Sequence, residues 1–279
     1  MSGEKEICAI IGSGSIGSSI AKGLVQSGRF PIENIIMTDR KTQVLEPLAE
    51  KGFVTNLDNK DAVSKASVVI IAVEPQHIDE LLDEISPIFI PGKQLLISVV
   101  SSVNLATIRR KFSKEMTIIR AMPNTAISIR EAMTCLTMDT DRPESMEIAK
   151  SIFDAVGKTL VIDEDQMTAA TALGACGIAF FLRAIRAASQ GGIEIGFHSE
   201  DALMIAAQTA KGAACLLQSM ETHPESEIDR VTTPKGCTIS GLNQMEHEGF
   251  SSAMIKGITT SASKATKLYC TGNACHLGD

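Results

Sequence analysis

The feature that constrains the fold most is a glycine-rich turn near the amino end of the chain. Residues 7–11 are ICAII, a short run typical of a buried strand, and GSGSIG follows directly. Apolar residues then recur at helical spacing, at Ile16, Ile20 and Leu24. A strand, a glycine turn and a helix in this order predict the first unit of a parallel sheet that binds a dinucleotide at the turn.

The three glycines of this turn have different expected roles. Gly12 permits the tight turn, Gly14 lets a pyrophosphate approach the backbone, and Gly17 lets the helix pack closely on the strand. The helix start faces the anion. We therefore expect the whole turn to contact the cofactor: Gly12, Ser13, Gly14, Ser15, Ile16 and Gly17.

The residues after the second expected strand bear on which dinucleotide binds. Asp39 stands 22 residues beyond Gly17, where an acidic residue would bind the ribose hydroxyls of NAD. Arg40 beside it would meet the 2′-phosphate of NADP. The two signals conflict, and a solvated turn is the alternative interpretation of both residues.

Strand and helix patterns alternate as far as about residue 163. Strands are expected at 32–40, 53–55, 67–73, 94–100 and 116–122, and helices at 42–52, 77–89 and 105–112. This alternation implies right-handed crossovers and a parallel sheet covered by helices on both faces.

Beyond residue 163 the chain is rich in Ala, has helical spacing and shows no strand pattern. We therefore expect an α/β chain of two domains, a Rossmann-type parallel sheet at 1–163 and an all-helical domain at 164–279. The helices are apolar over much of their circumference, which predicts burial against a second subunit in a homodimer at least.

The composition favours a folded protein with a small-molecule ligand. Of 279 residues 44% are hydrophobic, and the net charge of −7 lacks a basic cluster for nucleic acid or an anionic membrane. Unbroken apolar runs are far shorter than the roughly twenty residues of a membrane span. The amino-terminal segment MSGEKEICAIIG has no signal-peptide pattern, so we expect a cytoplasmic protein.

Cysteine and histidine do not predict a metal site. The seven Cys are odd in number and form no CxxC pair, which favours reduced thiols. Cys270, Cys275 and His276 gather near the carboxyl end, but a fourth ligand is missing, so we expect no metal. Each of the five His lies beside charged, hydroxyl or turn residues, as surface or loop His do.

No segment has the pattern of an activated nucleophile, such as GxSxG or a Cys with a nearby His. Hydride transfer does not require one. The cofactor carries that chemistry, and the protein mainly holds two carbons in line and excludes water.

Residues 231–242, VTTPKGCTISGL, place a Pro and Gly turn and hydroxyl residues in front of a helical pattern. One interpretation is a turn followed by a helix cap. The other is a carboxylate site, because backbone N–H groups at a helix start bind anions.

Four segments together resemble the pyrroline-5-carboxylate reductase family: AVEPQ at 72–76, IIRAMPNT at 118–125, GGIEIGF at 191–197 and HPESEIDRVTTPKGCTISGL at 223–242. The resemblance extends from residue 7 to about 268. It implies a Rossmann domain and a helical domain that interlocks with a partner subunit, in dimers and often larger rings of dimers. In that family NADPH, or sometimes NADH, reduces the cyclic imine of 1-pyrroline-5-carboxylate to L-proline.

The resemblance also implies site residues. Beyond the glycine turn, the cofactor is expected to contact Asp39, Asn59, Ala72, Val73, Glu74 and Pro75, with Val99 and Ser101 near the nicotinamide. The substrate is expected to contact Glu221, Lys235, Gly236, Cys237 and Thr238. Amides of residues 235–238 would hold its carboxylate, and the Thr238 hydroxyl would reach the ring nitrogen and supply or relay a proton.

Three departures from the family pattern stand out. Glu74 replaces a usual Lys, which reverses a charge near the cofactor. GACGIAF at 174–180 replaces SGSGPAY and loses hydroxyl groups. TPKG replaces SPGG, so that Lys235 adds a cation near the expected carboxylate site.

Other functions remain open at this point. A reductase of a related cyclic imine or of a 2-hydroxyacid would have the same build. A β-hydroxyacid dehydrogenase is disfavoured because residues 163–197 contain no Lys on the expected helix. A chain that binds NAD(P) as a sensor without turnover is the remaining alternative, and NADPH consumption with authentic substrate separates these cases.

Overall fold

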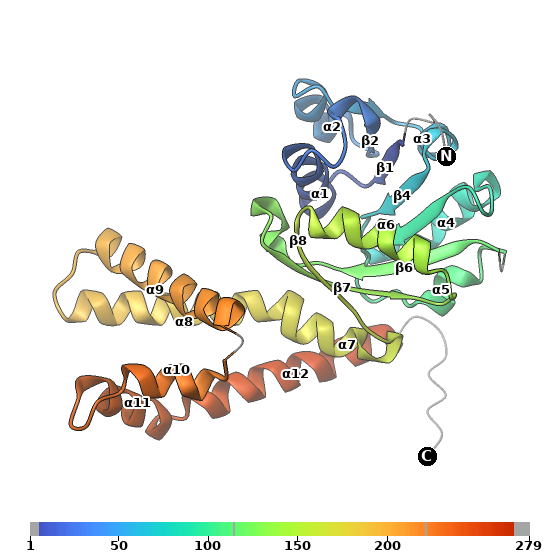
Figure 1. Ribbon diagram of the computed structural model, residues 1–279. Coiled ribbons are helices and arrows are strands. Elements are labelled where there is room, and N and C mark those ends of the chain that lie inside the picture. Colours follow the sequence, from blue (N-terminus) through green and yellow to red (C-terminus); the bar gives the residue numbers. More distant parts are fainter. Residues whose placement is uncertain (1–5, 114, 221, 271–279) are drawn as a thin grey trace, which may run out of the picture. The chain divides into compact units, whose positions relative to one another are not determined.

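The computed structural model describes residues 6–113, 115–220 and 222–270 (Figure 1). The chain divides by its internal contacts into two units. One, the sheet unit, comprises the residues up to Ala175 together with those from Ala262 onward, and the other, the helical unit, is Cys176–Ser261.

The sheet unit contains an eight-stranded sheet in the order β3-β2-β1-β4-β5-β6-β7-β8. The strands are β1 (Cys8–Ile11), β2 (Ile35–Thr38), β3 (Val54–Asn56), β4 (Val68–Ile71), β5 (Leu95–Ser98), β6 (Thr117–Met122), β7 (Ala132–Met138) and β8 (Gly157–Val161). All neighbouring strands are parallel except β6 and β7, which are antiparallel. The first six strands have the order of a Rossmann fold.

Helices and 3₁₀ turns connect these strands, and η5 and α7 follow the last of them. The helices are α1 (Ser15–Gln26), α2 (Thr42–Ala49), α3 (Asn59–Lys65), α4 (Ile78–Ile85), α5 (Leu105–Arg109), α6 (Pro143–Asp154) and α7 (Met167–Ala170). The 3₁₀ turns are η1 (Ile32–Asn34), η2 (Pro75–His77), η3 (Ser86–Ile88), η4 (Thr125–Ile129) and η5 (Glu164–Gln166).

Both faces of the central strands are buried, as the alternation of strands and helices predicts. In β1, Cys8 and Ile10 pack on one face with α1 and α6, whereas Ala9 and Ile11 pack on the other with α3, α4 and α5. Successive side chains of a strand point to opposite faces, so a strand covered on both sides is apolar throughout. Burial raises the pKa of the Cys8 thiol to about 12, which keeps it protonated.

Strands β7 and β8 and helix α6 are not predicted by the sequence patterns, and the expected purely parallel sheet needs a correction here. The connection from β6 to β7 is only the short turn η4, followed by Arg130 at a φ of 60°. Parallel neighbours need a crossover of a dozen or more residues, so a connection this short makes the pair antiparallel.

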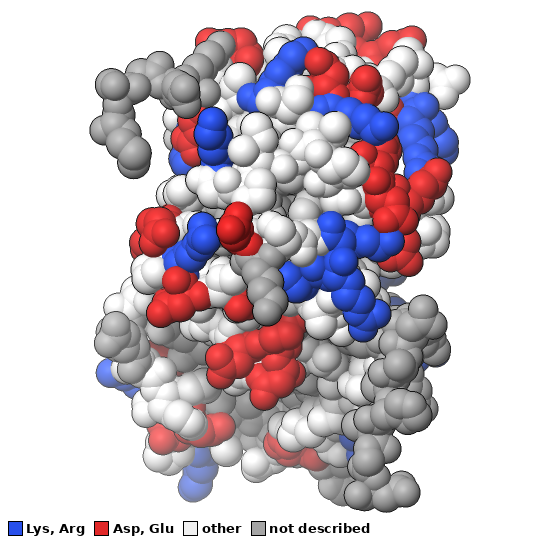
Figure 2. Space-filling model, turned by 90° about the vertical axis from the view of Figure 1, so that its right-hand side faces the viewer, with Lys and Arg blue, Asp and Glu red and all other residues white. Residues whose placement is uncertain are grey.

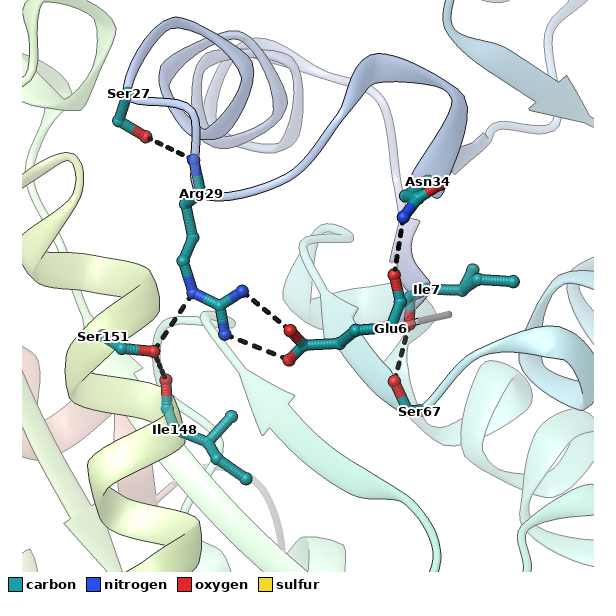
Figure 3. A network of polar contacts seen from close by, with 8 residues as sticks. All are labelled: Glu6, Ile7, Ser27, Arg29, Asn34, Ser67, Ile148 and Ser151. Carbon is teal, nitrogen blue, oxygen red and sulfur yellow. Dashed lines mark hydrogen bonds and ion pairs between the residues drawn. The ribbon is translucent and has the colours of Figure 1, made fainter. Parts of the chain in front are cut away.

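A polar network fastens the beginning of β1 to the helices on one face (Figure 3). The Arg29 guanidinium donates to both carboxylate oxygens of Glu6, at 2.8 and 3.0 Å, and to the Ser151 hydroxyl of α6 at 3.2 Å. The Asn34 amide donates to the Glu6 carbonyl at 3.1 Å. These bonds hold the strand that leads into the glycine turn.

The helical unit contains α8 (Gly177–Glu194), α9 (Ser199–Met220), α10 (Pro224–Val231), α11 (Cys237–His247) and most of α12 (Phe250–Cys270). Helices α8 and α9 lie side by side (Figure 1). They approach closely at Gly192, where an added Cβ would lie 3.1 Å from that of Ala202. Small residues permit this contact, as expected for closely packed helices.

Many large apolar side chains of the helical unit are exposed in the single chain. They include Phe181, Leu182, Ile195, Leu203, Met204 and Ile255. The helical stretch Glu164–Glu194 is long and apolar enough, by length and composition alone, to cross a membrane, and only 11% of its most apolar window is buried. An exposed apolar surface of this kind is typical of a contact with another molecule, and the sequence predicts a partner subunit as that molecule.

Candidate functional site

A pocket of about 310 Å³ opens where β1 and β2 end and residues 72–74 follow β4. This is the switch point of the sheet, because β2 and β3 lie on one side of β1 whereas β4 and the later strands lie on the other. Ligands bind at this point in Rossmann folds. Its lining residues are Ile11, Gly12, Gly14, Thr38, Asp39, Arg40, Lys41, Val44, Asn59, Ala72, Val73, Glu74, His77 and Leu81.

The glycine turn has the geometry that each expected role requires. Gly12 has a φ of 99°, and an added Cβ would lie 2.7 Å from the Ala72 carbonyl oxygen. Gly17 leaves no space either, because its Cβ would lie 2.0 Å from the Gly12 carbonyl oxygen. Gly14 faces open space instead, with no atom within 4 Å of an added Cβ. Bare backbone at the start of α1 is therefore accessible to an anion.

Asp39 is fixed at the end of β2 by backbone donors. Its carboxylate accepts hydrogen bonds from the Ser13 amide at 3.2 Å and from the Lys41 amide at 3.0 Å. The Ser13 hydroxyl donates to the Thr38 carbonyl at 2.9 Å. The carboxylate thus links the glycine turn to the end of β2, where a ribose lies in this fold.

Asn59 lies beside Asp39 in the lining of the pocket. Its side-chain oxygen accepts a hydrogen bond from the Thr38 hydroxyl at 2.7 Å, and its amide nitrogen donates to Glu84 of α4 at 3.2 Å. The first helical residue of α3 is thereby connected to both β2 and α4.

Charged side chains surround the same end of the pocket. Arg40 forms an ion pair with Glu80 of α4 at 2.6 Å. Glu74 accepts a hydrogen bond from Gln76 at 2.6 Å and lies 3.8 Å from the His77 ring nitrogen. On the face of the molecule in Figure 2, acidic and basic side chains are interspersed.

Half of the expected cofactor residues line this pocket: Gly12, Gly14, Asp39, Asn59, Ala72, Val73 and Glu74. Ser13, Ser15, Ile16, Gly17, Pro75, Val99 and Ser101 lie outside the lining. Ser13 and Gly17 are buried beneath the turn, and Val99 follows β5, with its amide bonded to the Ile71 carbonyl at 2.9 Å. Sequence motifs did not single out Lys41, Val44, His77 or Leu81. Their only signal was their position, after β2 for Lys41 and Val44, in η2 for His77 and on α4 for Leu81.

The TPKG segment of the helical unit forms a tight turn before α11. The Gly236 amide donates to the Thr233 carbonyl at 2.9 Å, with Pro234 and Lys235 between them. Lys235 has a φ of 62°, which glycine adopts more easily and which the family pattern SPGG suits. Gly236 is the N-cap, and its added Cβ would lie 2.5 Å from the Thr233 hydroxyl oxygen.

Helix α11 begins with Cys237 and Thr238 and has neither a side-chain cap nor an acidic residue in its first turn. The first backbone N–H groups of a helix lack partners within it, so this start suits a carboxylate. Thr238 is half-buried and Cys237 is exposed. Glu221, the remaining expected substrate residue, lies outside the described residues.

The GACGIAF segment is helical, as the helical spacing beyond residue 163 predicts. Residues Thr171–Cys176 form a π-helical turn that continues into α8. The segment has Ile in place of Pro, so the helix is able to continue. The Gly174 carbonyl accepts a hydrogen bond at 3.2 Å from Asn124 of the MPNT motif, which also caps η4.

Within residues 6–113, 115–220 and 222–270, no group of three or more His, Cys, Asp or Glu side chains is placed to hold a metal. Cys275 and His276 lie outside these ranges.

Comparison with known proteins covers both parts of the chain. A family model described as pyrroline-5-carboxylate reductase dimerisation matches residues 164–268, and one described as NADP oxidoreductase, coenzyme F420-dependent, matches residues 7–102. Pyrroline-5-carboxylate reductase 2 of Dictyostelium discoideum is 45% identical over 93% of this chain and 92% of that protein. The chain belongs to the pyrroline-5-carboxylate reductase family.

A second relative differs in length. Pyrroline-5-carboxylate reductase 1 of Dictyostelium discoideum is 52% identical over 94% of this chain, but the chain spans only 49% of that protein. Among solved structures, the Coxiella burnetii reductase has a TM-score of 0.88 at 29% identity and covers 95% of this chain and 99% of its own. The Plasmodium falciparum reductase, solved with NADP bound, has a TM-score of 0.84 at 21% identity, which shows the fold alone.

Proposed function

We propose that this chain reduces 1-pyrroline-5-carboxylate to L-proline with hydride from NAD(P)H. Family membership over nearly the whole chain is the observation that carries the proposal. The pocket at the glycine turn supports the proposal, because a reductase of this kind needs a site for a bound hydride donor.

The sheet unit is the cofactor-binding part of the proposal. The pyrophosphate lies over Gly14 at the start of α1, and the adenine ribose lies beside Asp39. NADPH is the proposed donor and NADH a possible second one, supported by the NADP oxidoreductase model at residues 7–102. Val99 and Ser101, which follow the carboxyl end of β5, are proposed to lie near the nicotinamide.

The start of α11 is the proposed substrate site. Its free amides bind the substrate carboxylate, and Lys235 contributes a positive charge. We assign Thr238 the role of donating or relaying a proton to the ring nitrogen, which gains electron density as the hydride arrives at the imine carbon. We assign Glu221, Gly236 and Cys237 to the same site from the family resemblance.

Thr238→Ala tests this assignment. We expect kcat/KM for 1-pyrroline-5-carboxylate to fall by about 10²-fold, because the variant lacks a proton donor in the transition state. Thr238→Ser is the matched control, since it keeps the hydroxyl and should retain most of the activity. If Thr238→Ala keeps the wild-type kcat/KM, Thr238 has no part in the mechanism. That result would leave the proposed reductase activity itself untouched.

The assembly and location follow less directly. The dimerisation model at residues 164–268 implies a homodimer, and the exposed apolar side chains of α8 and α9 are the surface we assign to it. A ring of dimers and a cytoplasmic location stay predictions, which sedimentation and localisation of the tagged chain test.

A further inference from the structure

Glu80 is the side chain that engages Arg40, the cation expected to meet a 2′-phosphate. We propose that Glu80 lowers the preference of this chain for NADPH over NADH by holding Arg40 in an ion pair. The inference rests on the proposed function only in taking the pocket as the dinucleotide site. Glu80 acts through Arg40 and is a positioning residue.

Asp39 and Arg40, the two charged residues that follow β2, have different partners at the end of the pocket where we propose that the adenine ribose lies. Asp39 is held toward the glycine turn by the amides of Ser13 and Lys41. Arg40 instead reaches α4, where its guanidinium lies 2.6 Å from the Glu80 carboxylate. Asp39, which suits the ribose hydroxyls of NADH, is therefore held beside the glycine turn. Arg40, which suits the 2′-phosphate of NADPH, is instead paired with Glu80.

The surrounding charges add to this effect. Asp39, Glu74, Arg40, Lys41 and His77 line the pocket, and Glu80 pairs with Arg40 from outside the lining. A 2′-phosphate brings further negative charge to a pocket whose Arg40 already has an acidic partner. NADPH must therefore compete with Glu80 for Arg40, whereas NADH, which lacks this phosphate, does not.

The expected size of the effect is modest. Arg40 and Glu80 are 57% and 72% exposed, and ion pairs this exposed stabilise a protein weakly. Glu80→Gln should lower the Kd for NADPH by about two- to fivefold relative to the Kd for NADH, the range that such a pair supports.

The experiment is a set of binding titrations with the purified full chain, without substrate. NADPH and NADH are titrated into wild type, Glu80→Gln, Arg40→Ala and the double variant, and competition with 2′,5′-ADP and 5′-AMP isolates the 2′-phosphate. Asp83→Asn is the matched control, because Asp83 lies on the same helix but pairs with Lys111, outside the pocket lining. Thermal unfolding of each variant establishes that it is folded.

The proposal predicts that Glu80→Gln favours NADPH and 2′,5′-ADP, that Asp83→Asn leaves both ratios unchanged, and that the effect of Glu80→Gln disappears in the Arg40→Ala background. An unchanged ratio in folded Glu80→Gln overturns it. So does an effect that persists without Arg40, since Glu80 would then act by direct repulsion. Failure of wild type to bind either dinucleotide would instead refute the dinucleotide site and the proposed function with it.

Discussion

At the scale of single residues, two kinds of contact shape the pocket at the glycine turn: the close packing around Gly12 and Gly17, and the ion pair of Arg40 with Glu80. The roles of Gly12 and Gly17 follow from local spacing, because the close approach of α1 to β1 is built into a strand, turn and helix in sequence. The pairing of Arg40 with Glu80 joins residues 40 positions apart, and no local pattern encodes it. The sequence therefore left the cofactor signals of Asp39 and Arg40 in conflict.

Lys235 is expected to affect both the stability of the fold and the binding of the substrate, and substitutions separate the two effects. Its left-handed backbone costs about 1 kcal/mol in a residue with a side chain, whereas its charge is proposed to attract the substrate carboxylate. Lys235→Gly should raise the free energy of unfolding by up to about 1 kcal/mol and raise KM for 1-pyrroline-5-carboxylate. Denaturant unfolding and steady-state kinetics measure the two effects.

Lys235→Ala is the matched control, since it removes the charge but keeps a Cβ. It should raise KM to a similar extent without the gain in stability. If Lys235→Gly leaves KM unchanged, the cation has no part in substrate binding.

At the scale of elements, short apolar runs were predictable as strands and mixed segments were not. Strands β1, β4 and β5 are buried on both faces, with β1 and β4 apolar throughout and β5 apolar up to Ser98. Strand β8 is largely exposed, and β7 contains Thr and Cys among its apolar residues, so neither has a clear strand pattern. The helical spacing beyond residue 163 predicts the GACGIAF segment as helical but not its π-helical turn, in which the Gly174 carbonyl accepts a hydrogen bond from Asn124.

The glycine turn offers a pair of substitutions that separates packing from cofactor binding. Gly17→Ala places a Cβ against the Gly12 carbonyl and should destabilise the fold by about 1–3 kcal/mol as α1 shifts from β1. Gly14→Ala meets no protein atom within 4 Å, so it should leave stability nearly unchanged. It should raise the Kd for NADPH about tenfold, because its methyl group occupies the space of the pyrophosphate.

Calorimetric unfolding and NADPH titration measure both variants. If Gly14→Ala binds NADPH with the wild-type Kd, the pyrophosphate does not lie over this turn.

At the scale of the whole molecule, the two-part organisation and the need for a partner were predictable from the change of pattern near residue 163. Ala-rich helices that are apolar on much of their circumference cannot be covered within 279 residues that already bury a separate sheet. The sequence did not predict that the helical stretch Glu164–Glu194 is apolar enough to meet the length and composition of a membrane span, because small and polar residues interrupt its apolar runs. The match of residues 164–268 to a dimerisation model favours a second copy of the chain as the cover of this surface.

The most direct measurement is the oxidation of NADPH by the purified chain, followed at 340 nm with authentic 1-pyrroline-5-carboxylate, together with quantitation of proline. We expect one L-proline to form for each NADPH consumed. A flat absorbance trace from folded chain that binds NADPH would contradict this expectation and would favour a dinucleotide sensor without turnover.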